Sequence, residues 1–301
     1  MKKIFLAIVL TLLMICNVSF ANSLKVTMLN VGQGDAILIQ TSTQNVLIDT
    51  SDADERKKLQ LELYKADAYR LDKIILTHPH ADHIANCAWL IQNGVFKVKS
   101  VYDNGIVSTS KYYQNYLAEC VNRNVPHESL KAGDVIDLGD GATLKILWLP
   151  PELVNFRNHF PDFKSNINNE SLVGLLTYGN FSMLLTGDAE SEVEETLNLQ
   201  HVTVLKAGHH GSKSSSTADF LKKIKPEYVL ISAGEHNIRG GNVYGHPHNE
   251  VLRNYLKVGV NKNNILWTAK NGTITIDTDG ITWKVTSEFD NNWLDFYLNN
   301  D

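Results

Sequence analysis

Residues 75–87 read ILTHPHADHIANC and place three histidines and one aspartate within six positions. The whole chain of 301 residues contains 11 histidines, so this cluster is too dense to be a chance event. The apolar run before it predicts a buried strand. His78 and His80 follow on extended backbone, where side chains two residues apart leave on the same side, and Asp82 and His83 lie where a helix begins. The stretch therefore predicts a metal site at the tip of a strand.

Further metal-binding side chains follow predicted strands later in the chain. Asp188 ends the run SMLLTGD, and the pair His209 and His210 ends VTVLKAGHH. His246 and His248 lie in YGHPHNEV, just before a predicted helix. Imidazole and carboxylate together suit Zn²⁺ and also Mn²⁺. Because the first cluster is too small to complete two metal positions, we expect these later residues to contribute.

The order of predicted elements indicates a single domain over residues 22–287. β-rich segments alternate with helices, without a Pro/Ser-rich linker, which favours sheets inside and helices outside. The acidic, Asn-rich residues 288–301 are expected to form a surface appendage. The predicted helices are 54–68, 83–93, 111–124, 190–199, 217–225 and 248–258. The predicted strands are 24–31, 35–41, 45–50, 72–78, 99–103, 143–149, 172–178, 181–186, 202–207, 228–232, 273–277 and 281–286.

Residues 1–21 have the pattern of a secretory signal peptide. Lys2 and Lys3 precede an apolar run at 4–15, and Ser-Phe-Ala ends at Ala21, where we expect cleavage. The alternative is an uncleaved membrane anchor, but the apolar run is short for a bilayer span. The pattern predicts a secreted or periplasmic protein with no stable membrane association after cleavage.

Composition limits the classes of function. The chain is 43% hydrophobic and 20% charged, with a net charge of −5, and loss of the two leader lysines would make it more acidic. An acidic protein is a poor general coat for nucleic acid, although a local basic groove is compatible with this charge. Cys87 and Cys120 are either a disulfide pair or two buried free thiols, and their spacing is not that of metal ligands. The sequence makes no prediction of oligomeric state.

The motif H-x-H-x-D-H at 78–83 resembles the signature of the metallo-β-lactamase fold, an α/β (α+β) αββα sandwich with its metal site along one edge. The chain is similar, over about residues 24–287, to the ComEC/Rec2-like branch of that fold, the hydrolase domain at the end of DNA-uptake channel proteins. It also resembles phosphorylcholine esterase. The segments that carry the resemblance are NVGQGDAILI, VLIDT, LTHPHADHI, NNESLV, LLTGDAE, LKAGHHGS and YGHPHNEVL.

The resemblance implies two divalent metal ions, most readily Zn²⁺ with Mn²⁺ as the alternative. His78 and His80 would hold the first metal, and Asp188 would bridge both. Many relatives supply a further histidine before the Gly-Asp strand, where this chain has Asn-Asn-Glu-Ser at 168–171. The first metal would therefore lack one protein ligand, which implies either weaker occupancy or an open position for water and substrate.

The second metal would be held by Asp82 and His83 together with one histidine of the 209–210 pair. Of the two, we expect His209 rather than His210 to be the ligand. The residues expected to be metal ligands are therefore His78, His80, Asp82, His83, Asp188, His209 and His210.

Two metals close together activate a water and clamp an in-line displacement at phosphorus. The leaving oxygen then needs a proton, and His246 or His248 is placed by the resemblance to provide it. The alternative role for these two histidines is capping of the helix that follows. We therefore expect Asp82, His246 and His248 to be the catalytic side chains.

The stretch KAGHHGSKSSS, residues 206–216 around the 209–210 pair, is suited to bind phosphate, because it combines backbone amides, hydroxyls and lysines. Lys206 is a further donor in that stretch, and Asp35 in GQGD is expected to brace the metal ligands from behind. The residues expected to contact the substrate are Asn169, Ser171, Ser212 and Lys213.

These patterns favour a secreted metal-dependent phosphodiesterase or nuclease whose partner is a phosphodiester, with extracellular DNA as the expected source. Two alternatives stay open. One is an esterase that acts on a small phosphodiester such as a phosphocholine ester. The other is a non-catalytic component of a DNA-uptake assembly. Hydrolysis of β-lactams is disfavoured by the motif branch, although the fold alone does not exclude it.

Overall fold

The computed structural model describes residues 23–149, 166–236 and 242–299. The predicted signal peptide at 1–21 lies outside the described residues, so its cleavage stays a prediction. Within the described ranges, no helix combines the length and the apolar character that a membrane span requires.

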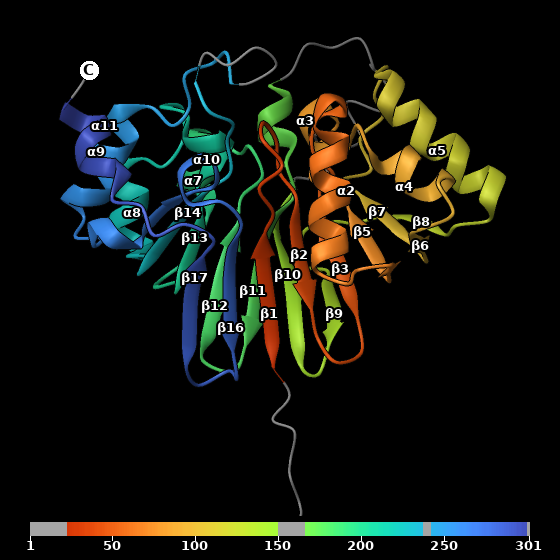
Figure 1. The fold of residues 1–301 in the computed structure, drawn as a ribbon, viewed down its shortest axis with the longest axis horizontal. Helices are drawn as coiled ribbons and strands as arrows, with labels where there is room; N and C mark the ends of the chain where they lie inside the picture. The colour runs from red at the N-terminus through yellow and green to blue at the C-terminus, as the bar shows by residue number, and fades with distance from the viewer. Residues whose placement is uncertain (1–22, 150–165, 237–241, 300–301) are drawn as a thin grey trace, which may run out of the picture.

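Two large sheets form the centre of the molecule (Figure 1). The eight-stranded sheet has the order β17-β16-β1-β2-β3-β5-β7-β8, and the seven-stranded sheet has the order β15-β14-β13-β12-β11-β10-β9. The first contains β1 Leu24–Met28, β2 Ile37–Gln40, β3 Asn45–Ile48, β5 Lys73–Ile75, β7 Val101–Asp103, β8 His127–Ser129, β16 Ile274–Thr278 and β17 Trp283–Ser287. The second contains β9 Val135–Gly139, β10 Ala142–Trp148, β11 Val173–Tyr178, β12 Phe181–Leu185, β13 Val204–Lys206, β14 Tyr228–Ile231 and β15 Ile265–Trp267. The short strands β4 Arg70–Leu71 and β6 Lys97–Val98 pair with each other.

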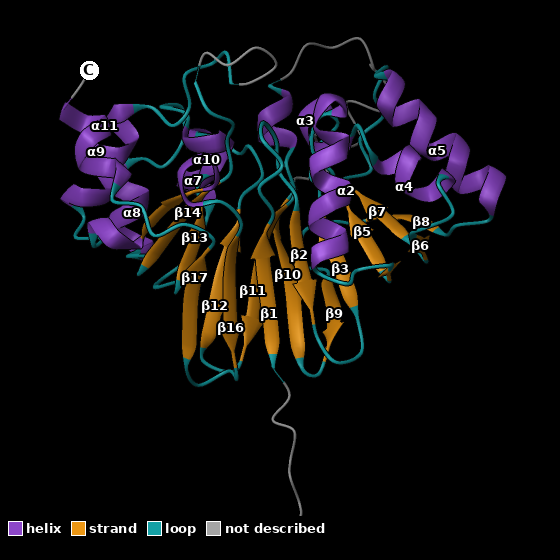
Figure 2. Cartoon of the chain, in the orientation of Figure 1, coloured by secondary structure: helices purple, strands orange, loops and turns teal. Residues whose placement is uncertain are grey.

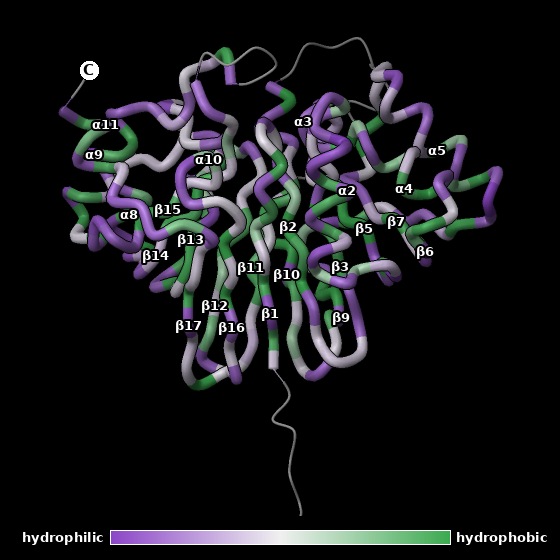
Figure 3. The backbone as a smooth tube through the Cα atoms, viewed as in Figure 1, coloured by the Kyte–Doolittle hydropathy of each residue, from purple (hydrophilic) through white to green (hydrophobic). Residues whose placement is uncertain are grey.

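The sheets pack face to face because the strands of both carry apolar side chains on the inner face. Val26 pairs with Ile39 between β1 and β2, and both are buried in the core between the sheets. Met183 and Val204, from β12 and β13, belong to the same core. Figure 3 shows the apolar colouring along the strands of both sheets.

Helices cover the two outer faces, as Figure 2 shows, with α2, α4 and α5 on one side and α8, α9 and α11 on the other. The described α-helices are α2 Arg56–Lys65, α3 Ala81–Ile84, α4 Cys87–Gln92, α5 Lys111–Arg123, α7 Ser191–Thr196, α8 Ala218–Ile224, α9 Asn249–Lys257, α10 Thr268–Asn271 and α11 Trp293–Asn299. Four short 3₁₀ helices lie at Ala53–Glu55, Ile167–Glu170, Gly208–Gly211 and Lys262–Asn264. The predicted αββα sandwich is confirmed.

Each sheet contains a parallel set of neighbouring strands. β3, β5 and β7 run parallel in one sheet, and β12, β13 and β14 run parallel in the other. The carboxyl ends of parallel neighbours meet at one edge of a sheet, where ligands of open α/β sheets bind. This edge is where the metal-binding side chains lie.

The structure differs from the sequence-based expectations at several places and decides one question that the sequence left open. The helix expected at 83–93 is two short helices, α3 and α4, because Asn86 turns inward and donates hydrogen bonds to the backbone carbonyls of Thr50 and Asp52. The C-terminal segment is not a mere appendage, since Trp293 of α11 is buried against the outer face of the seven-stranded sheet. The two cysteines, which the sequence left as either a pair or free thiols, are free thiols, one on α4 and one on α5, and both are buried.

Candidate metal centre

The ends of three strands bring the predicted ligands together at the carboxyl edge of the sheets. After β5 the chain continues through His78 and His80 into α3, which carries Asp82 and His83. Asp188 follows β12, and the 209–210 pair follows β13, the parallel neighbour of β12. The two halves of the chain therefore each supply part of the site.

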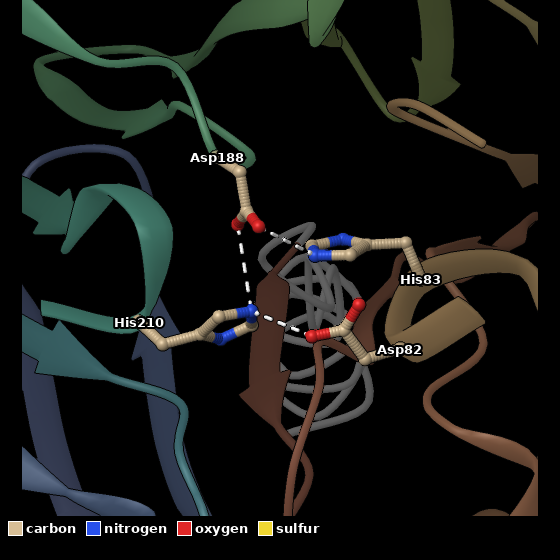
Figure 4. Close-up of side chains that lie close together, drawn as sticks. All are labelled: Asp82, His83, Asp188 and His210. Carbon is tan, nitrogen blue, oxygen red and sulfur yellow. Dashed lines mark ion pairs between the residues drawn. The ribbon is translucent and has the colours of Figure 1, made fainter. Parts of the chain in front are cut away.

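Four side chains converge in one group, which Figure 4 shows pointing toward a common centre: Asp82, His83, Asp188 and His210. The Nε2 atom of His83 lies 3.2 Å from Oδ2 of Asp188. Nε2 of His210 lies 3.2 Å from Oδ2 of Asp82 and 3.5 Å from Oδ1 of Asp188. Two ring nitrogens and two carboxylates thus face each other without an intervening side chain.

A second group lies beside the first and shares a member with it. It consists of His78, His80 and Asp188, whose ligand atoms all lie within 4.8 Å of one another. Nε2 of His78 is 3.7 Å from Oδ2 of Asp188. Because Asp188 belongs to both groups, it occupies the position of a bridging carboxylate.

The atoms at this centre fit divalent metal ions. Nε2 of His83, Nε2 of His210 and Oδ1 of Asp188 are buried and make no hydrogen bond within the described part of the chain. Buried polar atoms are normally hydrogen-bonded, so a convergent set of unsatisfied ones needs a binding partner. Imidazole nitrogens and carboxylate oxygens are the donors that Zn²⁺ and Mn²⁺ accept. The His/Asp set therefore suits divalent metals.

The protonation states also suit metal binding. Burial lowers the pKa of His78 well below its ordinary value, and burial likewise lowers that of His80, so both rings are neutral ligands at neutral pH. Burial favours the protonated form of Asp188, but the positive charge available to His83 and His210 lowers its pKa well below the ordinary value. Burial opposes a positive charge on His83 and His210, but Asp188 and the other nearby carboxylates raise the pKa of both rings well above the ordinary value, so a metal would bind there by displacing protons.

Buried hydrogen bonds orient the ligand rings from behind. Nδ1 of His83 lies 2.7 Å from Oδ2 of Asp49, which also accepts the Thr77 hydroxyl at 2.7 Å. Nδ1 of His210 lies 2.7 Å from the Ser232 carbonyl. Such contacts fix the ring tautomer and leave Nε2 directed at the metal position.

The two residues of the 209–210 pair take different roles. Both have left-handed backbone, with φ of 46° for His209 and 56° for His210, and their ring centroids are 6.2 Å apart. His210 joins the four-residue group, whereas Nε2 of His209 lies 3.8 Å from Oδ2 of Asp188. Nδ1 of His209 lies 3.1 Å from Oε1 of Glu190. The geometry therefore favours His210 as the metal ligand, contrary to the expectation from the sequence.

His246 and His248 lie on the same side of the centre. The ring centroid of His246 is 5.3 Å from that of His209 and 4.9 Å from that of His248. His246 is buried, and its Nδ1 makes no hydrogen bond to any described residue. Burial and the neighbouring histidines lower its pKa to about 3, so the ring is uncharged at neutral pH. His248 precedes α9, and its Nδ1 accepts the backbone N–H of Lys213 at 3.1 Å.

Of the four residues expected to bind substrate, two are buried, one is half-buried and one is exposed. Ser171 is fully buried, and its hydroxyl accepts the Asp188 N–H at 3.0 Å and lies 3.2 Å from Nδ1 of His78, so it braces ligands and cannot reach a substrate. Ser212 is also buried, with its hydroxyl 3.0 Å from that of Ser214. Lys213 is exposed beside His248.

The remaining one, Asn169, uses its side chain to hold the start of α7. Its Oδ1 accepts the Glu190 N–H at 2.9 Å, and its Nδ2 donates to Glu192 at 3.2 Å. Lys206, expected among the phosphate donors, is buried with 1% exposure, because Nζ forms an ion pair with Asp35 at 2.6 Å. The structure places Asp35 behind the ligands, 3.4 Å from Nδ1 of His210.

Comparisons with known proteins agree with this fold. Residues 29–162 match the model of the metallo-beta-lactamase superfamily. This match covers less than half of the chain, and together with the αββα architecture it shows the metallo-beta-lactamase fold. It is 34% identical over 272 residues to ComE operon protein 3 of Bacillus subtilis, which covers 83% of this chain and 32% of that protein. Identity to competence protein ComA of Neisseria gonorrhoeae is 27%, covering 78% of this chain and 30% of that protein.

These matches confirm the resemblance to the ComEC/Rec2-like branch, and the chain spans about a third of the length of the curated relatives it matches. Among solved structures, the metallo-beta-lactamase fold protein YhfI from Bacillus subtilis aligns with a TM-score of 0.52 and 14% identity. The alignment covers 81% of this chain and 95% of that one, and it shows a shared fold.

Two residues near the centre were not identified from the sequence. Asp49 directly follows β3, and its N–H donates to the carbonyl of Ile75 at the end of the parallel neighbour β5, so its position at the end of a buried strand was an available signal. Glu190 follows Asp188 by two residues and orients His209. Its role depends on a turn that brings distant segments together, and no local pattern indicates it.

Proposed function

We propose that this protein is a secreted, metal-dependent phosphodiesterase that cleaves nucleic acid. The observation that carries the proposal is the sharing of Asp188 by the two groups of ligands. Two metals that share a carboxylate are typical of sites that hydrolyse phosphate esters, because one metal contacts the nucleophile and the other the leaving oxygen. Zn²⁺ is the proposed metal, since imidazoles outnumber carboxylates in both groups taken together.

When bound, the two metals would activate a water and neutralise the charge that builds on the phosphoryl oxygens. Side chains of the protein would contact and orient the substrate. His246 is uncharged, and its unsatisfied Nδ1 is a hydrogen-bonding atom next to the centre. We assign it the contact to the phosphoryl or leaving oxygen. His209, held by Glu190, lies between His246 and Asp188 and orients the same end of the substrate.

Two exposed side chains at this end favour a nucleotide over a small head group. The Lys213 ammonium is available to an adjacent phosphate. The Tyr244 ring is 66% exposed and stacks on the His246 ring with a centroid distance of 5.8 Å. An exposed aromatic ring beside a phosphate-binding centre suits a nucleobase, and base stacking on an aromatic ring contributes about 1–3 kcal/mol. The similarity to a relative that is named a competence protein supports nucleic acid as the substrate.

A substrate screen tests the proposal. The protein without its first 21 residues is stripped of metal, reloaded with Zn²⁺ or Mn²⁺, and assayed on single-stranded and double-stranded DNA, RNA and bis(p-nitrophenyl) phosphate. We expect metal-dependent cleavage of nucleic acid, and inhibition of nitrophenolate release by DNA. Turnover of p-nitrophenyl phosphorylcholine without inhibition by DNA would instead show a small-ester esterase. Two bound metals without any turnover would show a binding component.

Asp188→Asn is the matched control, because it keeps the shape of the side chain and removes the negative charge shared by the two groups. We expect it to lose metal and activity together. The export part of the proposal has its own test, which is N-terminal sequencing of the protein from the extracellular or periplasmic fraction. Asn22 as the first residue is the expected result, and an intact Met1 in the membrane fraction would contradict it.

A further inference from the structure

Lys206 is a buried charge that neither the metal ligands nor the proposed reaction uses directly. It ends β13 with 1% exposure, and its Nζ lies 2.6 Å from Oδ2 of Asp35 and donates to the Gly187 carbonyl at 3.0 Å. Lysines are almost never fully buried unless paired. Burial of the Lys206 ammonium therefore has a large desolvation cost, which its two contacts must offset.

The two partners of Lys206 belong to different sheets. Asp35 precedes β2 of the eight-stranded sheet, and Gly187 follows β12 of the seven-stranded sheet. Each partner is directly connected to metal ligands. The Asp35 N–H donates to the Asp82 carbonyl at 3.1 Å. Oδ1 of Asp35 lies 3.4 Å from Nδ1 of His210.

The other partner leads to the bridging ligand, since Gly187 immediately precedes Asp188. The Lys206 ammonium thus contacts both sides of the interface between the two sheets. The residues expected to hold the metals also come from both sides of this interface. The four-residue group takes Asp82 and His83 from one half of the chain and Asp188 and His210 from the other.

We infer that Lys206 is a positioning residue that ties the two sheets together at the metal edge and sets the distance between the two pairs of ligands. Metal–ligand distances are tolerated within about 0.2 Å. A tie between the halves would therefore raise metal affinity by holding the ligands in place before the metal arrives. The inference depends on the metal-binding part of the proposed function and not on its substrate.

The test is metal binding by Lys206→Met, which keeps an apolar stem of similar length and removes the ammonium. Zn²⁺ affinity is measured by competition with a chelator, and Co²⁺ absorption reports the ligand geometry. We expect Zn²⁺ affinity to fall about 10–100-fold, the usual effect of losing a group that supports metal ligands. We also expect the Co²⁺ absorption bands to shift. Unchanged affinity and an unchanged spectrum would overturn the inference.

A second variant distinguishes the Lys206 contact between the two sheets from simple charge balance. It also stays informative if Lys206→Met folds poorly. Lys206→Met combined with Asp35→Asn removes both charges of the buried pair, a change that proteins often tolerate. Lys206→Met alone should lower the thermal unfolding midpoint of the metal-free protein, because it leaves the Asp35 charge buried and unpaired. We expect the double variant to recover most of that midpoint, while its Zn²⁺ affinity stays low. Recovery of both would show that only the unpaired charge mattered, and would refute the tie.

Asp103→Asn is the control for general destabilisation. Asp103 is a buried carboxylate that accepts the Tyr116 hydroxyl at 2.7 Å and belongs to neither group of metal ligands. Its replacement should lower the unfolding midpoint without changing Zn²⁺ affinity or the Co²⁺ spectrum. All of these measurements use protein without substrate, so failure to find a phosphodiester substrate would leave them interpretable.

Discussion

Nε2 of His210 lies 3.2 Å from Oδ2 of Asp82, so two residues 128 positions apart in the chain face each other across the metal centre. The neighbouring ring of His209 lies outside the four-residue group, with its Nε2 3.8 Å from Oδ2 of Asp188 and its Nδ1 3.1 Å from Oε1 of Glu190. Consecutive left-handed residues make this division possible, because they direct successive side chains to different sides of the turn. Only one histidine of the pair can then complete the four-residue group.

The first prediction compares His210→Asn with His209→Asn. Asn is the replacement because it adopts left-handed backbone more readily than most residues. We expect His210→Asn to lose one metal per molecule and nearly all turnover, and His209→Asn to keep both metals while turnover falls. Metal content after gel filtration checks this. Loss of metal from His209→Asn alone would reverse the assignment and restore His209 as the ligand.

The second prediction concerns His246, whose unsatisfied Nδ1 lies next to the centre. His246→Ala should leave metal content unchanged and lower kcat about 10²–10⁴-fold, the usual range for a positioned acid–base group. The loss should be greater for nucleoside leaving groups than for nitrophenolate, which departs without a proton. Equal losses for both substrates would indicate phosphate binding instead of assistance to the leaving group.

The third prediction links the C-terminal helix to the site. The Tyr297 hydroxyl of α11 lies 2.8 Å from the His236 ring, and Nε2 of His236 lies 2.6 Å from the His246 carbonyl. Tyr297→Phe keeps the ring, which packs on Trp267 with a centroid distance of 5.6 Å. Loss of about one hydrogen bond should lower kcat roughly 2–10-fold at constant metal content.

The control for that prediction is Asp295→Asn on the same helix. Asp295 is exposed, and its ion pair with Lys262 lies at the surface. Its replacement should change neither kcat nor metal content. An equal effect of both variants would indicate that α11 acts through overall stability and not through the contact to His236.

The fourth prediction concerns the pH dependence of stability and uses a pair that belongs to neither group of metal ligands. Nε2 of His127 lies 2.8 Å from Oδ2 of Asp103, and this hydrogen bond raises the pKa of His127 above its ordinary value near 6.5. Burial favours protonated Asp103, but the hydrogen bond from His127 lowers its pKa below the ordinary value of 3.8. The folded state therefore favours the charged form of both residues.

A pKa that differs between the folded and unfolded states makes the free energy of unfolding depend on pH. The His127 contribution is complete below about pH 6.5 and is lost as the pH rises through the raised folded pKa. The Asp103 contribution is present above about pH 3.8 and is lost at lower pH. His127→Gln should therefore reduce the free energy of unfolding by about 1.5 kcal/mol near pH 5, with a smaller reduction at pH 9. Urea titrations at the two pH values check this, and a reduction that does not vary with pH would contradict it.

The sequence by itself was sufficient for most of the fold. Alternation and apolar runs predicted the central strands, such as β2 and β12, because a strand between packed layers must be apolar on its inner face. The cluster at 78–83 indicated the metal centre for a similar reason, since its ligands are close in sequence and lie on one short segment of backbone. Short strands such as β8 and β15, and helix α11, were missed because their stability comes from packing against distant segments.

Tertiary structure alone decided how the second half of the site is used. The sequence-based expectation preferred His209, whereas the structure favours His210, because the choice depends on two left-handed backbone angles and on a carboxylate from another turn. It placed Ser171 and Lys206 at the substrate, whereas packing buries both of them behind the ligands. The physical reason is the same in each case. A polar side chain after a strand can face the open edge or the interior, and which way it faces is set by partners from the opposite sheet.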